Sequence, residues 1–174
     1  MPITINGSGT VTGITAGGLP DAIITQPELA TGVAGTGPAF SAYTSGGQSI
    51  TNAVSTKITF NTEFFDTNSN FDNSTNYRFT PTVAGYYQVS YTVFLSSASG
   101  IISAVLQKNG VQYLVTQAPL SSTGVGLPLS TLVYLNGTTD YIEAYVYQTS
   151  GSTLTTNSSR SDLYQFSAAM VRSA

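Results

Sequence analysis

The stretch from Arg78 to Leu95 constrains the fold more than any other part of this sequence, because its polarity alternates over many residues. Apolar side chains occupy every second position: Tyr87, Val89, Tyr91, Val93 and Leu95. A period of two is that of a β-strand with one buried face. Because Pro81 and Gly85 punctuate the start of the stretch, we predict a short strand over 77–80 and a long one from Gly85, central in its sheet.

The rest of the chain from Pro38 onward has the same character. Ser, Thr, Val, Ile and Tyr dominate, and turns such as Asn109-Gly110 and Asn136-Gly137 separate short apolar runs. Strands are predicted over the ranges 39–44, 49–52, 56–60, 77–80, 85–97, 101–107, 111–116, 128–135, 140–148 and 163–171. Short strands at this spacing predict an all-β sandwich or barrel, with its longest loops at 61–76 and 117–127.

A resemblance narrows this class. Residues 71–81 read FDNSTNYRFTP and residues 85–91 read GYYQVSY, which is similar to the signature of the C1q/TNF-like jelly-roll family. Further pieces follow in that family's order: Pro38 to Ala42, Lys108-Asn109-Gly110, Val133 with Leu135, Asp140 with Ile142, and Phe166 to Val171. The resemblance covers residues 38–174. It implies an antiparallel jelly-roll sandwich that forms compact homotrimers, as found in bacteriophage head decoration and tail fibre proteins.

Residues 1–37 differ from the rest of the chain. Glycines recur every few residues with only short apolar clusters between them, so this segment cannot bury a core alone. One interpretation is a short extended Gly-rich anchoring arm, which resembles segments ahead of such domains in phage proteins; the other is a flexible leader. We predict the arm, anchored by two clusters: Ile3 with Ile5, and Ile23 with Ile24.

The composition indicates an assembly. Charged residues make up 7% of the chain, against roughly 25% in an ordinary soluble protein. With so few charges, electrostatic repulsion between copies is weak. We therefore expect other subunits to cover much of the surface. The chain has no Cys and no secretion signal at its start, so its extracellular-type composition favours a virus particle assembled in the host cytoplasm. The alternative is a cytoplasmic or otherwise exported protein with an unusual composition.

The same sequence argues against several function classes. The five basic residues are scattered and the net charge is −3, so binding to nucleic-acid phosphates is not expected. No apolar run approaches the roughly 18 residues that span a bilayer. Without His or Cys, catalytic triads and His/Cys metal centres are impossible. Asp140 and Glu143 should point to opposite faces of a strand rather than form an acid–base pair. We expect no enzyme activity and no cofactor.

One loop invites a test for metal binding. Asp66, Asn68, Asn70 and Asp72 imitate the first half of a Ca²⁺-binding EF-hand loop. The positions that need Gly and a bidentate Glu are then occupied by Phe and Tyr. Members of the resembled family bind Ca²⁺ near the trimer apex, but no residue-level match to that site is visible here. We interpret the loop as a solvated Asn/Asp turn and keep its four side chains as a weak Ca²⁺ candidate.

The strand predicted over 140–148 is rich in tyrosine on its second face. Its two faces are Ile142, Ala144 and Val146 on one side and Tyr141, Glu143, Tyr145 and Tyr147 on the other. In a two-layer sandwich only one face of a strand meets the core. The tyrosines are therefore either ordinary strand residues with hydroxyls in water or part of a subunit interface. We predict a trimer interface at Tyr141, Tyr145 and Tyr147.

These expectations combine into one function and two alternatives, of which one is a cellular C1q-like adhesin. We predict a non-enzymatic bacteriophage virion structural protein: a homotrimeric jelly-roll head decoration (cement) protein exposed on the particle surface. Residues 1–37 would bind the major capsid protein or another virion protein, and residues 38–174 would form the jelly roll. The other alternative is a receptor- or glycan-binding tip of a tail or head fibre, which contacts a host surface glycan through the loops 61–76 and 117–127.

Overall fold

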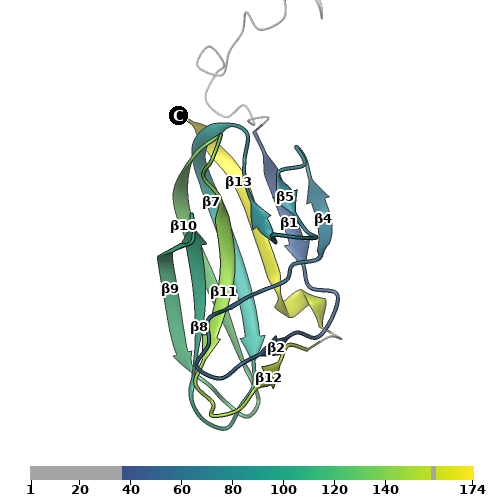
Figure 1. Cartoon of the computed structure of the whole chain (residues 1–174), viewed down its shortest axis with the longest axis vertical. Helices are drawn as coiled ribbons and strands as arrows, with labels where there is room; N and C mark the ends of the chain where they lie inside the picture. Colours follow the sequence, from purple (N-terminus) through teal and green to yellow (C-terminus); the bar gives the residue numbers. More distant parts are fainter. Residues whose placement is uncertain (1–36, 158–159) are drawn as a thin grey trace, which may run out of the picture. The chain divides into compact units, whose positions relative to one another are not determined.

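The computed structural model of the chain describes residues 37–157 and 160–174 (Figure 1). They form strands and one short 3₁₀ helix: β1 (Ala39–Tyr43), β2 (Ser49–Ile50), β3 (Thr56–Lys57), β4 (Thr62–Asp66), β5 (Phe71–Asp72), β6 (Arg78–Phe79), β7 (Ala84–Leu95), β8 (Ile101–Lys108), β9 (Val111–Pro119), β10 (Val125–Asn136), β11 (Ile142–Gln148), β12 (Leu154–Thr155), η2 (Ser161–Leu163) and β13 (Gln165–Ser173). The proposed anchoring residues of the arm lie outside the described residues: Ile3, Ile5, Ile23 and Ile24. The arm therefore stays a prediction.

The strands form the antiparallel jelly-roll sandwich that the sequence predicts. One sheet has five strands in the order β10-β7-β13-β1-β4. The other has six strands: β5-β6-β11-β8-β9 run side by side, and β3 also pairs with β11. A separate two-stranded ribbon joins β12 and β2. Within the described residues every strand pair is antiparallel, and neighbours such as β13 and β1 come from opposite ends of the domain (Figure 1).

Strand β7 confirms the alternation that opens the sequence. Its predicted apolar face is buried, with exposed fractions of at most 1%, and the intervening Gln88 and Ser90 are exposed. The strand lies inside its sheet between β10 and β13, although β13 holds the middle position. The short strand before it is β6, which belongs to the other sheet, so the segment around Pro81 crosses from one sheet to the other.

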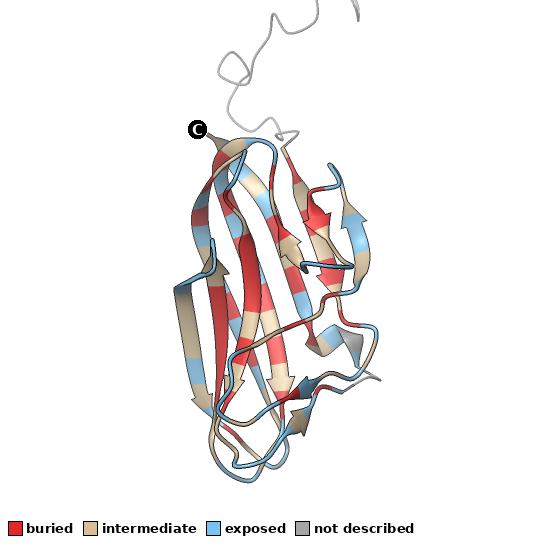
Figure 2. Cartoon of the chain, in the orientation of Figure 1, coloured by how far each residue is buried: buried red, intermediate tan, exposed pale blue. Residues whose placement is uncertain are grey.

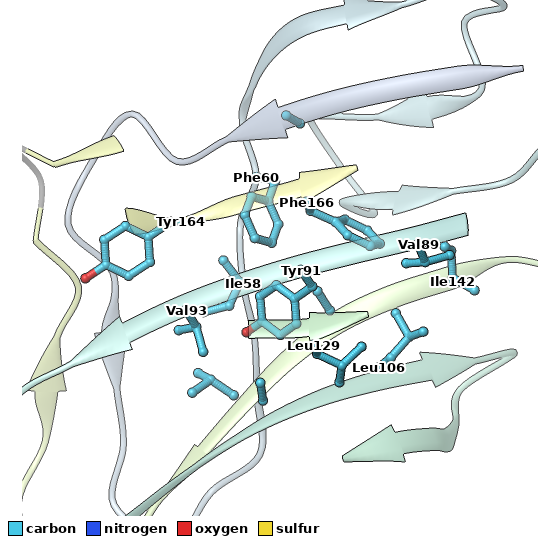
Figure 3. Packing of buried hydrophobic residues seen from close by; sticks show 14 of the residues in the cluster. Ile58, Phe60, Val89, Tyr91, Val93, Leu106, Leu129, Ile142, Tyr164 and Phe166 are labelled. Atoms are coloured by element: carbon cyan, nitrogen blue, oxygen red, sulfur yellow. The ribbon is translucent and has the colours of Figure 1, made fainter. Parts of the chain in front are cut away.

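The core fills the space between the sheets with aromatic and aliphatic side chains (Figures 2 and 3). Phe166 packs against Phe60 with ring centroids 5.5 Å apart, and Phe40 stacks on Phe71 at 4.4 Å. Aromatic pairs of this kind add about 0.5 to 1.5 kcal/mol each beyond the area they bury. The phenylalanines come from β1, β5, β13 and the segment after β3, so their contacts fix the sheets against each other.

Three buried tyrosines keep their hydroxyl groups paired. Tyr87 donates to the carbonyl oxygen of Val83 at 2.6 Å, and Tyr91 reaches across the core to that of Tyr145 at 3.1 Å. Tyr164 donates to the carbonyl oxygen of Phe94 at 2.9 Å. Each bond satisfies a polar atom that would otherwise cost free energy in the core. Tyrosine is therefore a core residue on this sandwich as well as a surface residue.

Both stretches expected to be long loops are partly strand. Residues 61–76 contain β4 and β5, and residues 117–127 are shared between the end of β9 and the start of β10. Period-two alternation fails at β4 because Phe64 and Phe65 are adjacent and both exposed, next to a register shift in the pairing with β1. Conversely, the strand expected over 56–60 shortens to Thr56–Lys57, and the expected start at 163 falls within η2.

Candidate interaction surfaces

The register of the five-stranded sheet determines which side chains share its outer face. The outward positions of its four long neighbours β10, β7, β13 and β1 include Pro128, Ser130, Leu132, Tyr134, Tyr86, Gln88, Ser90, Thr92, Gln165, Ser167, Ala169, Ala39, Ser41 and Tyr43. Arg172, near the end of β13, is the one charged residue on these four strands. We call this outer surface the low-charge face.

Large apolar side chains stand exposed at one end of the low-charge face. Tyr86 is 45% exposed and Tyr134 is 41% exposed, and their rings lie 5.5 Å apart on paired positions of β7 and β10. Leu132, two residues earlier on the same face of β10, is 53% exposed. Two cations border the cluster: Arg172 is paired with Tyr86 in strand register, and the ammonium of Lys108 lies 5.7 Å from the ring centroid of Tyr134. An exposed apolar cluster with charges only at its border has the composition of the centre of a subunit interface.

The middle of the low-charge face is built from small residues. Ser130, Ser90, Ser167 and Ser41 occupy successive paired positions across four strands, and Phe65 of β4 follows in the same row. A depression of about 310 Å³ lies beside Phe65 over this row. Short side chains between exposed aromatic residues leave room for another protein surface to approach the sheet closely.

The three tyrosines of the predicted interface lie on or next to β11 of the six-stranded sheet, not on the low-charge face. Tyr145 and Tyr147 lie on the outer face of β11, and Tyr141 directly precedes that strand; all three are half-buried. The guanidinium of Arg78 lies 4.3 Å from the ring centroid of Tyr141, and the ammonium of Lys57 lies 5.7 Å from that of Tyr145. Two of the three rings thus already have cationic partners within the same chain.

The tyrosine-bearing face also contains a partly buried ion pair. Glu143 is only 5% exposed and accepts a hydrogen bond from Lys57. Burial opposes the charge on Lys57, but the hydrogen bond and the charge of Glu143 outweigh it and raise the pKa of the Lys57 ammonium. With Arg78 paired to Glu143 in strand register, this face carries more charge than the low-charge face.

Asp140 and Glu143 each bind a different lysine. Asp140 contacts the ammonium of Lys108 at 2.9 Å and accepts from the side-chain amide of Asn109 at 2.8 Å. Burial alone would raise the pKa of Asp140, but Asn109 and Lys108 together lower it. Both carboxylates therefore hold parts of the fold together, as acceptors for groups on neighbouring strands and turns.

The Ca²⁺ candidate loop uses its oxygens to hold turns. Asp66 accepts from the backbone N–H groups of Asn68 and Phe71 at 3.2 and 2.7 Å, and the side-chain oxygen of Asn70 accepts from Thr82 N–H at 3.1 Å. Asp72 accepts from the N–H groups of three residues in the next turn, Ser74, Thr75 and Asn76. Bonds to the Thr75 and Ser74 N–H groups hold the pKa of Asp72 far below its usual range.

The loop oxygens of the Ca²⁺ candidate already accept hydrogen bonds from the protein. Those of Asp66, Asn70 and Asp72 accept from three different sets of N–H donors, and the Ca²⁺ site stays a prediction. Among the described residues, no group of three or more His, Cys, Asp or Glu side chains is placed to hold a metal ion. Asn68 donates its own N–H to Asp66, which makes it part of the same turn.

Sequence reasoning missed the apolar cluster of Tyr86, Leu132 and Tyr134. A signal was present, because alternation over 128–135 buries Leu129, Val133 and Leu135 and so places Leu132 and Tyr134 on the face otherwise held by Ser130. Only the pairing of β10 with β7 brings Tyr134 beside Tyr86 and makes one cluster of them.

Two antiparallel sheets in this strand order define a jelly-roll domain of the C1q/TNF-like type. The chain belongs to the C1q domain family, whose model matches residues 39–161. Among proteins of curated function, none matches this sequence. Within the described residues, no helix has the length and apolar character needed to cross a membrane.

Several solved structures have the same fold at low sequence identity. PRD1 vertex protein P5 is 21% identical, over 79% of this chain and 99% of its own, with a TM-score of 0.59. Murine APRIL is 8% identical, over 78% and 99%, with a TM-score of 0.60. Eiger TNF from S. frugiperda is 13% identical, over 79% and 92%, with a TM-score of 0.57. At these identities the likeness establishes the fold and leaves function to be argued from the surfaces.

Proposed function

We propose that this protein is a non-enzymatic structural component of a bacteriophage virion, which acts as a homotrimeric head decoration (cement) protein. In this proposal the jelly roll forms the trimer, and residues 1–37 attach it to the major capsid protein or to another virion protein. The low-charge face is the observation that carries the proposal, because a surface of this composition is best stabilised when another subunit covers it.

The low-charge face favours a second copy of the same chain as its occupant. An exposed Tyr86–Leu132–Tyr134 cluster adjoins a strip of small residues, so it can receive a partner's apolar edge without a clash. Arg172, the one charged residue on these strands, borders the cluster beside Tyr86, and Lys108 of β8 borders it beside Tyr134, so the proposed contact needs these two cations to remain in water or to find acceptors on the partner. Three identical contacts around a threefold axis close the assembly and leave no copy of the face exposed.

The tyrosine-bearing face remains the competing interface. Burying it would desolvate Arg78 as well as the Lys57–Glu143 pair, which costs free energy unless new partners replace water. Covering Leu132 itself desolvates no charge, although Arg172 and Lys108 border its cluster. We therefore place the trimer contact on the low-charge face and propose that Tyr141, Tyr145 and Tyr147 face outward.

A virion location rests on two supports. The fold is shared along 99% of the length of PRD1 vertex protein P5, whose name places that protein at a viral vertex. The chain also has only 7% charged residues, as expected for a protein that functions inside a larger assembly. We propose no enzyme activity, because a chain without His or Cys cannot form a Ser-His-Asp or Cys-His arrangement.

The trimer is tested by light scattering of the purified chain and of two matched variants. The wild type should have three times the 18.1 kDa mass of one chain. Leu132→Asp should be monomeric yet folded by circular dichroism, because Leu132 is already half exposed in the single chain. Tyr145→Asp should remain trimeric. A monomeric wild type would refute the trimer, and dissociation by Tyr145→Asp alone would move the interface to the tyrosines.

The virion role is tested on particles. Removing residues 1–37 from a cement protein should abolish its attachment to the particle and lower the particle's resistance to heat. For the fibre-tip alternative, the truncated protein should still bind host cells. That alternative has one specific support in this structure, an uncharged polar depression on the outer face of the six-stranded sheet. Attachment that is unchanged after the truncation would overturn the role of the arm.

A further inference from the structure

A depression of about 170 Å³ lies on the outer face of the six-stranded sheet, over β8, β9 and the end of β11. Its floor is Val105 and Val115, which are paired across β8 and β9. Tyr147 forms one wall, and the rim carries three glutamines: Gln107, Gln112 and Gln117. None of the residues that line the depression is charged.

The strand register explains why the sheet is hollow here. Ser103 on β8 lies between Tyr147 of β11 and Gln117 of β9, and Val105 lies between Tyr145 and Val115. The short Ser103 is thus flanked by longer side chains on both neighbouring strands, and Val105 by a longer one on β11 only. The result is a trough along β8, which Ser55 closes at one side.

The polar groups around the trough have unused hydrogen-bonding capacity. Within the described residues, the side chains of Gln107, Gln112 and Tyr147 make no hydrogen bond to the protein. Gln117 donates from its amide nitrogen to Ser103 at 2.9 Å, so its amide oxygen remains available. Amides and a phenol offer both donors and acceptors at close spacing, which suits vicinal hydroxyl groups.

The lining also selects against other ligands. Anions such as phosphates and carboxylates require Arg, Lys or aligned N–H groups, and the trough supplies no cation. Its volume is below the roughly 300 to 1,000 Å³ of sites for drug-sized ligands. An apolar valine floor and a tyrosine wall favour a compact ligand with C–H groups on one face and hydroxyl groups on its edge.

The geometry points to a binding site for an uncharged sugar ring, a single pyranose of a larger glycan. The C–H face of the ring rests on Val105, Val115 and Tyr147, and its hydroxyl groups bond the three glutamine amides. The site lies on the opposite sheet from the low-charge face, so its existence does not depend on the proposed trimer. If the trimer forms, three copies of this weak site act together through effective concentration.

The test is a titration of the full chain, labelled with ¹⁵N, with free glucose, galactose, mannose, N-acetylglucosamine and glucuronic acid. We expect saturable chemical-shift changes with at least one neutral sugar, confined to β8, β9 and β11, and none with glucuronic acid. Affinity in the millimolar range is expected for a single ring. The oligomeric state is measured in the same samples, so a failure of binding is distinguished from a failure of the trimer.

Two variants sharpen the result. Gln112→Ala, at an exposed rim position, should weaken the sugar's affinity roughly tenfold. Thr155→Ala, at an exposed position of β12 outside both the depression and the low-charge face, should leave it unchanged. Three outcomes would overturn the site: no saturable shift with any neutral sugar, shifts centred elsewhere, or equal loss of affinity in both variants. Binding of glucuronic acid as tight as that of glucose would also overturn it.

Discussion

At the scale of single residues, three buried tyrosines and one lysine have raised pKa values, which make the stability of the fold depend on pH. Burial raises the pKa of Tyr87 to about 12, and it raises the pKa of Tyr91 and of Tyr164 as well. The pKa of Lys57 is also raised, because its contact with Glu143 outweighs the burial that opposes the charge. All four groups hold their protons more tightly when folded than when unfolded.

Stability should therefore fall in alkali. The contribution of these groups is fully present below the unfolded tyrosine pKa of about 10 and is lost as pH rises through the higher folded values. We predict a free energy of unfolding that is constant between pH about 7 and about 9 and declines towards pH about 12. Denaturant unfolding at a series of pH values measures it. In Tyr87→Phe the decline should be shallower, and a flat wild-type profile would contradict the assignment.

The Lys57–Glu143 pair should matter more than the exposed pair of Arg160 and Asp162. Glu143→Gln leaves a partly buried lysine without its charge partner, and we predict a loss of about 1 to 3 kcal/mol in unfolding free energy. Asp162→Asn is the matched control, because the side chains of both Arg160 and Asp162 are more than half exposed. This variant should change the unfolding free energy little. Equal losses in the two variants would show that burial does not set the strength of the pair.

At the scale of elements, side chains from one sheet protect the edge of the other. Strand β10 is an edge strand, and three of its carbonyl oxygens accept side-chain bonds: Tyr134 from Lys108 at 2.7 Å, Leu132 from Tyr113 at 3.1 Å and Pro128 from Thr116 at 3.3 Å. These donors come from β8 and β9. These side chains occupy carbonyl oxygens that a strand of another protein would need in order to pair with β10. A partner should therefore bind the face of this sheet rather than its edge.

The β8–β9 hairpin depends on its two-residue turn. Asn109 and Gly110 both have positive φ, 54° and 76°, which is the type I′ geometry that Asn-Gly favours. A Cβ added at Gly110 would meet only the Tyr141 hydroxyl, at 3.6 Å, so Gly110→Ala tests backbone strain almost alone. We predict a loss of about 1 kcal/mol by denaturant unfolding. Gly46→Ala, in open space without positive φ, should be neutral or slightly stabilising, and a similar loss there would contradict this account.

At the scale of the whole molecule, we assign different roles to the outer faces of the two sheets. The low-charge face is proposed for self-association, and the face with Tyr147 and the glutamines for contact with ligands outside the trimer. A trimer in which folding and association are coupled unfolds at a temperature that depends on protein concentration. We predict that the wild-type midpoint rises with concentration, whereas that of Leu132→Asp does not. Scanning calorimetry at several concentrations distinguishes the two, and a wild-type midpoint independent of concentration would contradict the coupling.

Much of the fold was predictable because local rules and tertiary structure agree along most of the strands. The alternation of β7, the Asn109-Gly110 turn and the core side of β11 all follow from period and turn chemistry. Strands of two residues, such as β5 and β12, were not predictable, since their pairing depends on partners distant in sequence. The trimer interface at Tyr141, Tyr145 and Tyr147 is a prediction that this single-chain structure leaves to the paired variants.

The sequence by itself determined the class of fold and the absence of His and Cys chemistry, because period, turn residues and composition are local properties. The tertiary structure decided which surfaces exist. Tyr86 and Tyr134 are far apart in sequence and meet only because β7 pairs with β10, and the trough along β8 depends on the register that puts Ser103 between the longer Tyr147 and Gln117. Cross-strand neighbours are set by register, and register depends on the packing of the whole sandwich.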